Sequence, residues 1–220
     1  ILSHLEIKED ELILSHDESF TENEVFFARS WPRSVSIVGE NILELKRDFP
    51  DLIQATQESK KFWPVHTLSF PAHDYIAGEI ANCVDEIGRK IPETPFYSFE
   101  INDGNNLKSK KNALIMGGVH AGEDVGDLAL WEFVKWQLSD EEKAKILREN
   151  YLIRVYPMVN ASGRYAGYWR NAPDSLVDTN RQWGFEVPEN DCVRVAKRIM
   201  VNDLNGERLI WGFDFHAAPG

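Results

Sequence analysis

Apolar residues follow two different patterns along the second half of the chain, one periodic and one continuous. From Asp124 to Leu138 they recur every three or four residues, which predicts a helix. Continuous apolar runs that predict buried strands lie at 112–116, 151–159 and 208–215. Further helical patterns lie at 140–149 and 189–201. Because predicted strands alternate with predicted helices, the chain is expected to form an α/β domain with a mainly parallel, mixed sheet and helices on both faces.

The first half of the chain has a weaker pattern. We predict a helix over 41–57 that is interrupted at Phe49-Pro50, and a second helix over 75–88 that Gly88 and Pro92 end. Short segments that resemble strands lie at 11–14, 25–28, 65–70 and 96–101. The pattern contains no internal repeat and no low-complexity tract.

A histidine and a glutamate stand three residues apart between a predicted strand and a predicted helix. They are His120 and Glu123, in the run Gly-Gly-Val-His-Ala-Gly-Glu. His216 directly follows the last predicted strand. Since ligands of open α/β sheets bind at the carboxyl ends of the strands, the three side chains can converge there. A structural histidine is the alternative for each imidazole.

Two imidazoles and one carboxylate can hold Zn²⁺ at three corners of a tetrahedron and leave the fourth for water. Zinc lowers the pKa of such a water to about 7, so a strong nucleophile becomes available near neutral pH. The residues His120, Glu123 and His216 therefore predict a metal-dependent hydrolase.

Further motifs lie between these candidate ligands. They are Asn160-Ala161-Ser162-Gly163, then Trp169-Arg170, then Asp178-Thr179-Asn180-Arg181-Gln182-Trp183. In this order, with the preceding His-x-x-Glu and the late His, they resemble the M14 family of zinc carboxypeptidases, and most closely its cytosolic-carboxypeptidase branch. The resemblance covers about residues 112–220. The family pattern has Pro-Asp where this chain has Ala161-Ser162.

The resemblance implies that His120, Glu123 and His216 hold the zinc ion. It also implies that Asp178 accepts a hydrogen bond from the second ring nitrogen of His120 and so fixes the orientation of that ring.

The resemblance also implies roles in substrate binding. Asn180 and Arg181 are expected to bind the terminal carboxylate of a peptide, because a guanidinium can bind a carboxylate through two charge-assisted hydrogen bonds. Arg170 is expected to stabilise the oxyanion that forms on the scissile carbonyl. Arg164 is the alternative for this second role.

In this family a glutamate well past the last zinc ligand acts as general base, and a tyrosine closes over the substrate. Both are expected beyond Gly220, so the resemblance predicts that the C-terminal part of the domain is missing from this chain. We expect residues 1–34 to be a lead-in segment and residues 35–220 to be the N-terminal portion of a catalytic domain.

Two alternatives to a peptidase function remain open. One is an N-acyl amino acid deacylase of the aspartoacylase and succinylglutamate desuccinylase type. The other is a non-catalytic module that binds carboxylates, if no base follows residue 220.

Composition narrows the class of partner. The chain has 24 basic and 36 acidic residues and a net charge of −12, which argues against nucleic acid and anionic membrane as partners. The expected substrate is a peptide or a small acyl amino acid.

Two cysteines are too few for a zinc ribbon or a disulfide framework. No apolar run is long enough to cross a membrane. Without a signal peptide at the start of the chain, the expected location is the cytoplasm, although a removed signal would leave no trace.

Overall fold

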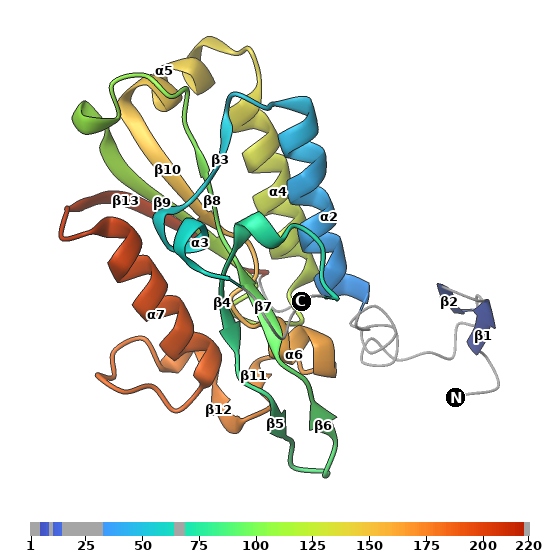
Figure 1. Cartoon of the computed structure of the whole chain (residues 1–220). Coiled ribbons are helices and arrows are strands. Elements are labelled where there is room, and N and C mark those ends of the chain that lie inside the picture. Colours follow the sequence, from blue (N-terminus) through green and yellow to red (C-terminus); the bar gives the residue numbers. More distant parts are fainter. Residues whose placement is uncertain (1–4, 9–10, 15–32, 64–68, 218–220) are drawn as a thin grey trace.

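A five-stranded sheet forms the centre of the computed structural model, which describes residues 5–8, 11–14, 33–63 and 69–217 (Figure 1). Its strand order is β13-β9-β10-β8-β3. The strands are β3 (Ile53–Ala55), β8 (Phe99–Ile101), β9 (Lys111–Gly117), β10 (Tyr151–Tyr156) and β13 (Leu209–Phe215). β13, β9 and β10 are parallel neighbours, while β8 is antiparallel to both β10 and β3. All strands except β8 therefore point the same way, which confirms the predicted mainly parallel, mixed sheet.

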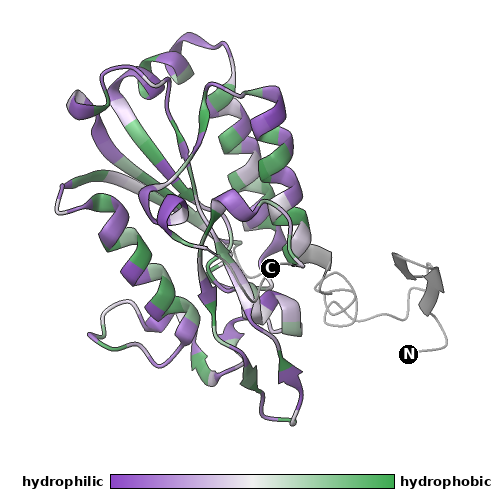
Figure 2. Cartoon of the chain, viewed as in Figure 1, coloured by the Kyte–Doolittle hydropathy of each residue, from purple (hydrophilic) through white to green (hydrophobic). Residues whose placement is uncertain are grey.

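Helices cover both faces of this sheet, as predicted (Figure 1). On one face, α2 (Arg33–Asp48) and α4 (Asp124–Leu138) share a core with Ile115 and Ile153. On the other face, α7 (Asp191–Leu204) packs against Leu114 and Tyr156. Successive strand residues point to opposite faces, so a strand covered on both sides is apolar at most of its positions. Figure 2 shows green, apolar stretches on the central strands, interrupted by purple positions.

The remaining elements are short. The helices are α3 (Gln57–Lys61), α5 (Glu142–Asn150) and α6 (Ala161–Ala166), with 3₁₀ turns η2 (His73–Tyr75), η3 (Leu107–Ser109) and η4 (Thr179–Arg181). Paired short strands are β1 (Leu5–Lys8) with β2 (Glu11–Leu14), β4 (Ile76–Ile80) with β7 (Thr94–Tyr97), β5 (Cys83–Val84) with β6 (Lys90–Ile91), and β11 (Asn171–Ala172) with β12 (Ser175–Asp178). None of the described helices is long and apolar enough to cross a lipid bilayer.

The helix predicted over 75–88 was wrong. Residues 76–80 form β4, which pairs with β7, and residues 83–84 form β5. Ile76, Ile80 and Val84 recur at helical spacing, but pairing with a strand more than ten residues later overrides this local signal. The close packing also explains Gly78: a Cβ atom there would lie 2.9 Å from Cδ1 of Ile199.

Other predicted bounds shift for identifiable reasons. The helix predicted over 41–57 begins earlier, at Arg33, and ends at Asp48, since Pro50 cannot continue it and residues 53–55 form β3. The strand predicted over 96–101 divides at Ser98, because β7 and β8 belong to different sheets. Residues 25–28 lie outside the described residues, as does most of 65–70. The predicted domain boundary between residues 34 and 35 stays a prediction.

Candidate metal centre

The pairing of β13 with β9 brings the candidate ligands together. Phe215 is the register partner of Gly117, so His216 and the His120 loop leave neighbouring strands at the same edge of the sheet. Gly118 turns the chain with a φ of 61°, and a Cβ atom there would lie 2.6 Å from Sδ of Met158. A left-handed conformation with so little space favours glycine. Three residues after His120, Glu123 is the N-cap of α4.

The three side chains form one compact group. The Nδ1 atom of His120 lies 2.8 Å from one carboxylate oxygen of Glu123, and the Nδ1 atom of His216 lies 2.7 Å from the other. Potential ligand atoms of the three residues all lie within 4.8 Å of one another. His120 and Glu123 are buried, whereas His216 is partly exposed. The structure thus brings together the predicted ligand residues; their role as zinc ligands stays a prediction.

The outer nitrogens of both rings are also held by carboxylates. The Nε2 atom of His120 lies 2.8 Å from Oδ1 of Asp178, as the resemblance implied, and the Nε2 atom of His216 lies 2.9 Å from Oδ2 of Asp214. An Nε2–H group that donates to a carboxylate leaves the Nδ1 lone pair free to bind a metal. Both Nδ1 atoms face Glu123, so this donor set fits a zinc ion with two imidazoles and one carboxylate.

Asp214 was absent from the sequence prediction. It precedes His216 by two residues on β13, and residues two apart on a strand share a face. A hydrogen bond from a ligand histidine to a carboxylate is a common feature of zinc sites. The alternation Asp-Phe-His at the end of the last strand was therefore a usable signal.

Replacing Asp214 by alanine is expected to weaken zinc binding by about 10–100-fold, because His216 loses the carboxylate that orients its ring. The affinity can be measured by competition with a chelator of known zinc affinity. Asp140→Ala is the matched control, since the side chain of Asp140 is fully exposed. An unchanged affinity in the Asp214 variant would contradict the role of this carboxylate.

Negative charge surrounds the two imidazoles. Although burial raises the pKa of Glu123, its hydrogen-bond contacts with the rings of His120 and His216, and the hydrogen bond that it accepts from the backbone N–H of Ala217, lower it below its ordinary value. Burial also raises the pKa of Asp178, but the hydrogen bonds from His120, Arg170 and the backbone N–H of Asn180 together lower it below its ordinary value. Burial lowers the pKa of His216, but the neighbouring carboxylates of Asp214 and Glu123 raise it overall. The group therefore favours a cation.

The two arginines considered for oxyanion binding have different environments. The Nη2 atom of Arg170 lies 3.1 Å from Oδ2 of Asp178, and its Nη1 atom lies 3.8 Å from Oε1 of Glu123. Its side chain is 38% exposed, so a bound molecule can reach it. By contrast, Arg164 is 4% exposed and pairs with Asp124 and Asp127. Of the two guanidiniums, only that of Arg170 is accessible beside the candidate ligands.

Asn180 and Arg181 lie in the turn that follows Asp178. The backbone N–H of Asn180 donates to Oδ1 of Asp178 over 2.9 Å, and Arg181 donates to the carbonyl oxygen of Asn180 over 3.3 Å. Arg181 is exposed. The structure therefore joins this turn to the candidate centre through Asp178 and leaves the guanidinium facing solvent.

Thr179 is a second residue that sequence reasoning missed. Its hydroxyl lies 2.5 Å from the carbonyl oxygen of Val119 and 2.9 Å from that of Arg170. It therefore links the His120 loop, the Arg170 segment and the turn at 178–181. One of its partners, Val119, lies sixty residues earlier in the sequence, so no local signal identifies this link.

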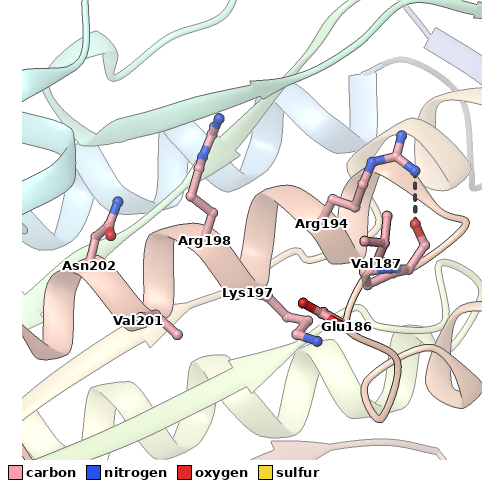
Figure 3. A pocket seen from close by; sticks show the side chains of 8 residues that line it. Glu186, Val187, Arg194, Lys197, Arg198, Val201 and Asn202 are labelled. Atoms are coloured by element: carbon pink, nitrogen blue, oxygen red, sulfur yellow. Dashed lines mark hydrogen bonds between the residues drawn. The ribbon is translucent and has the colours of Figure 1, made fainter. Parts of the chain in front are cut away.

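A surface pocket of about 470 Å³ lies elsewhere, on α7 (Figure 3). In Figure 3, Arg194 and Arg198 extend to one side of the helix and Lys197 to the other. Arg194 and Lys197 already donate to backbone carbonyls of the loop before α7. None of the candidate residues named above lines this pocket, so it is separate from the candidate centre.

Known proteins share part of this sequence. A family model described as zinc carboxypeptidase matches residues 76–202. The chain is 28% identical to cytosolic carboxypeptidase 6 of Mus musculus over 139 residues, which cover 60% of this chain and 26% of that protein. It is 31% identical to cytosolic carboxypeptidase 2 of Danio rerio over 110 residues, which cover 50% of this chain and 15% of that protein. The chain thus spans about a quarter or less of the length of these two relatives.

The fold is shared with solved carboxypeptidase structures. Thrombin activatable fibrinolysis inhibitor aligns over 93% of this chain and 51% of its own, with a TM-score of 0.53 and 13% identity. A metallo-carboxypeptidase from Burkholderia cenocepacia aligns over 62% of this chain and 36% of its own, with a TM-score of 0.50 and 20% identity. At these identities the likeness concerns the fold alone.

Proposed function

The chain belongs to the zinc carboxypeptidase family, and on this premise we propose that the protein is a zinc-dependent hydrolase that removes the C-terminal amino acid of a peptide. Family membership by itself supports a hydrolase. The observation that carries the finer proposal is the convergence of two Nδ1 atoms on the carboxylate of Glu123, with an accessible arginine beside it. We propose that His120, Glu123 and His216 hold the ion.

A zinc ion held by these residues would supply a water of lowered pKa and would polarise a carbonyl group. Asp178 holds two members of the site at once. Its Oδ1 atom accepts from His120 and its Oδ2 atom accepts from Arg170. The orientation of a zinc ligand and that of the guanidinium are therefore fixed by one carboxylate.

Arg170 is proposed to donate to the carbonyl oxygen of the scissile peptide bond. Negative charge develops on this oxygen when water attacks the carbon, and a guanidinium already in place stabilises that charge. Its pairing with Asp178 orients Arg170 before the substrate arrives, while partial exposure leaves donor groups available.

Asn180 and Arg181 are proposed to bind the terminal carboxylate. The amide of Asn180 and the guanidinium of Arg181 can both donate to it, and charge-assisted bonds of this kind are the stronger class. Their attachment to Asp178 supports this role, because a carboxylate site at a fixed distance from the metal would select the last peptide bond.

Replacing Arg181 by alanine should lower kcat/KM for peptides with a free C-terminus by roughly 10–150-fold, which corresponds to the loss of a hydrogen bond to a charged group of about 1.5–3 kcal/mol. Peptides of the same sequence with an amidated C-terminus should be affected little, because they lack the carboxylate. Rates of amino-acid or amino-acid-amide release measure both. Arg198→Ala, on the surface of α7, is the control. Equal losses on the two substrates would argue against this role.

The proposal as a whole is tested on the full-length protein. We expect about one zinc ion per chain by elemental analysis. We also expect release of C-terminal amino acids that stops on chelation and returns with added zinc. Hydrolysis of N-acyl amino acids without peptide cleavage would favour the deacylase alternative. Zinc and carboxylate binding without turnover would favour a binding module.

Family membership supports two further proposals. We propose that residues 35–220 are part of the catalytic domain and that residues 1–34 lead into it. We also propose a cytoplasmic location, since the matched relatives are named cytosolic carboxypeptidases.

A further inference from the structure

A buried ionic cluster lies directly behind the candidate centre. Arg164 on α6 contacts both Asp124 and Asp127 in the first turn of α4, through two different guanidinium nitrogens. The side chains of Arg164 and Asp127 are 5% and 13% exposed, and that of Asp124 is 30% exposed. Asp124 is the residue after Glu123. The proposed mechanism uses none of the three side chains.

The cluster closes a ring of contacts around the segment from His120 to Glu123. On the side before His120, the backbone N–H of Asn160 donates to the carbonyl oxygen of Gly118 over 2.8 Å. Asn160 also caps α6, with its side-chain oxygen 2.9 Å from the backbone nitrogen of Gly163. On the side after Glu123, Arg164 joins α6 to α4. The segment is therefore held at both of its ends by the same short helix.

The first turn of α4 also lies against the third candidate ligand. A Cβ atom on Gly126 would lie 2.9 Å from the carbonyl carbon of His216 and 3.1 Å from its Cα atom. No side chain fits in that space, so the helix packs directly on the backbone of His216. A shift of this turn would change the separation between Glu123 and His216.

The energetics of buried charges indicate that the cluster of Arg164, Asp124 and Asp127 fixes local geometry more than it stabilises the fold. Desolvation of buried charges offsets most of their attraction, so replacing such a cluster by apolar groups is often neutral for stability. Burial raises the pKa of Asp127 to about 7 even though Arg164 opposes this rise. What a two-pronged guanidinium does provide is a fixed direction between its partners.

We propose that Arg164 is a positioning residue that holds the first turn of α4, and thereby sets the Glu123 carboxylate between the rings of His120 and His216. This inference rests on the proposed function, because it treats these three residues as metal ligands. Arg164 itself touches neither metal nor substrate.

The chain offers a matched control at the other end of the same helix. Arg148 is 6% exposed, and its guanidinium donates to the carbonyl oxygens of Gln137 and Ser139 near the C-terminus of α4. Arg148 and Arg164 are thus both buried arginines that anchor α4, but only Arg164 anchors it next to Glu123.

The experiment compares Arg164→Met, Arg164→Lys and Arg148→Met in the full-length protein. Three quantities are measured: unfolding of the metal-free protein, zinc affinity by chelator competition, and the visible absorption spectrum after cobalt substitution, which reports ligand geometry. Arg164→Met should weaken zinc binding at least tenfold and change the cobalt spectrum. Arg164→Lys should restore part of both, since one ammonium can pair with one of the two carboxylates. Arg148→Met should alter the unfolding of the metal-free protein and leave the zinc affinity and the cobalt spectrum unchanged.

Equal zinc affinities and cobalt spectra in Arg164→Met and wild type would overturn the inference, as would equal effects of Arg148→Met and Arg164→Met. Should Arg164→Met fail to fold, Gly126→Ala gives a second route to the same question. It keeps the ionic cluster but displaces the turn from His216, and an unchanged cobalt spectrum in it would also overturn the inference. If the wild-type protein binds neither zinc nor cobalt, the proposed function itself fails, which is a distinct result.

Discussion

Replacing His120 by alanine is expected to reduce bound zinc from about one ion per chain to nearly none and to lower peptide hydrolysis to background. The two remaining candidate ligands, Glu123 and His216, cannot complete a zinc site that needs three protein ligands and a water. Among the described residues, His120, Glu123 and His216 form the one group of side chains that could hold a metal ion, and His120 is buried at 2% exposure. Elemental analysis after dialysis measures the zinc content.

His73→Ala is the control for this variant, because His73 lies in η2 and is not part of the candidate group. It should retain both zinc and activity. Circular dichroism must show that the His120 variant is folded, since an unfolded protein would lose zinc for a trivial reason. A folded His120→Ala protein with full zinc occupancy would remove His120 from the ligand set.

Local periodicity was sufficient for the elements that carry the candidate centre. The helix predicted from Asp124 to Leu138 has those bounds in the structure, and β9 and β13 each lie within one residue of their predicted positions. The helix is 15 residues long and β9 is largely buried, so their hydrophobic pattern leaves little choice of structure. β13 is mostly exposed, and its run of apolar residues was sufficient to predict it. The convergence of His120, Glu123 and His216 then follows from the parallel order of two strands.

Sequence reasoning failed where the deciding contact lies far along the chain. Apolar residues in the segment 75–88 recur at helical spacing, but residues 76–80 form a strand because they pair with β7. Thr179 bonds to carbonyl oxygens sixty and nine residues away, and Arg164 pairs with carboxylates about forty residues away. Nothing in the local sequence marks these partners, because each depends on how the loops at the sheet edge pack together.

Asp178 shows why the predicted site residues belong together. It contacts His120 and Arg170 with its two oxygens and receives the backbone N–H of Asn180. One short turn therefore links a candidate metal ligand, the proposed oxyanion donor and the proposed carboxylate site. Changes at Asp178 should affect all three functions at once, whereas changes at Arg170 or Arg181 should separate them.

Replacing Arg170 by alanine is expected to lower kcat by about 10²–10³-fold, which corresponds to the loss of roughly 3–4 kcal/mol of oxyanion stabilisation. The effect should fall mainly on kcat because the negative charge exists only in the transition state. Zinc content should stay near one per chain, since Arg170 lies 3.8 Å from Glu123 and is not a candidate ligand. Steady-state kinetics with a peptide that has a free C-terminus measure the loss.

The same variant separates two explanations of a low rate. Arg170 donates to Asp178, which in turn accepts from His120, so its removal could also act by loosening the ligand. In that case zinc affinity would fall together with kcat, and Arg170→Lys, which keeps a positive charge near Asp178, would restore both. Loss of kcat with unchanged zinc affinity supports a direct role on the carbonyl oxygen. A variant with normal kcat and raised KM would instead assign Arg170 to ground-state binding of the substrate.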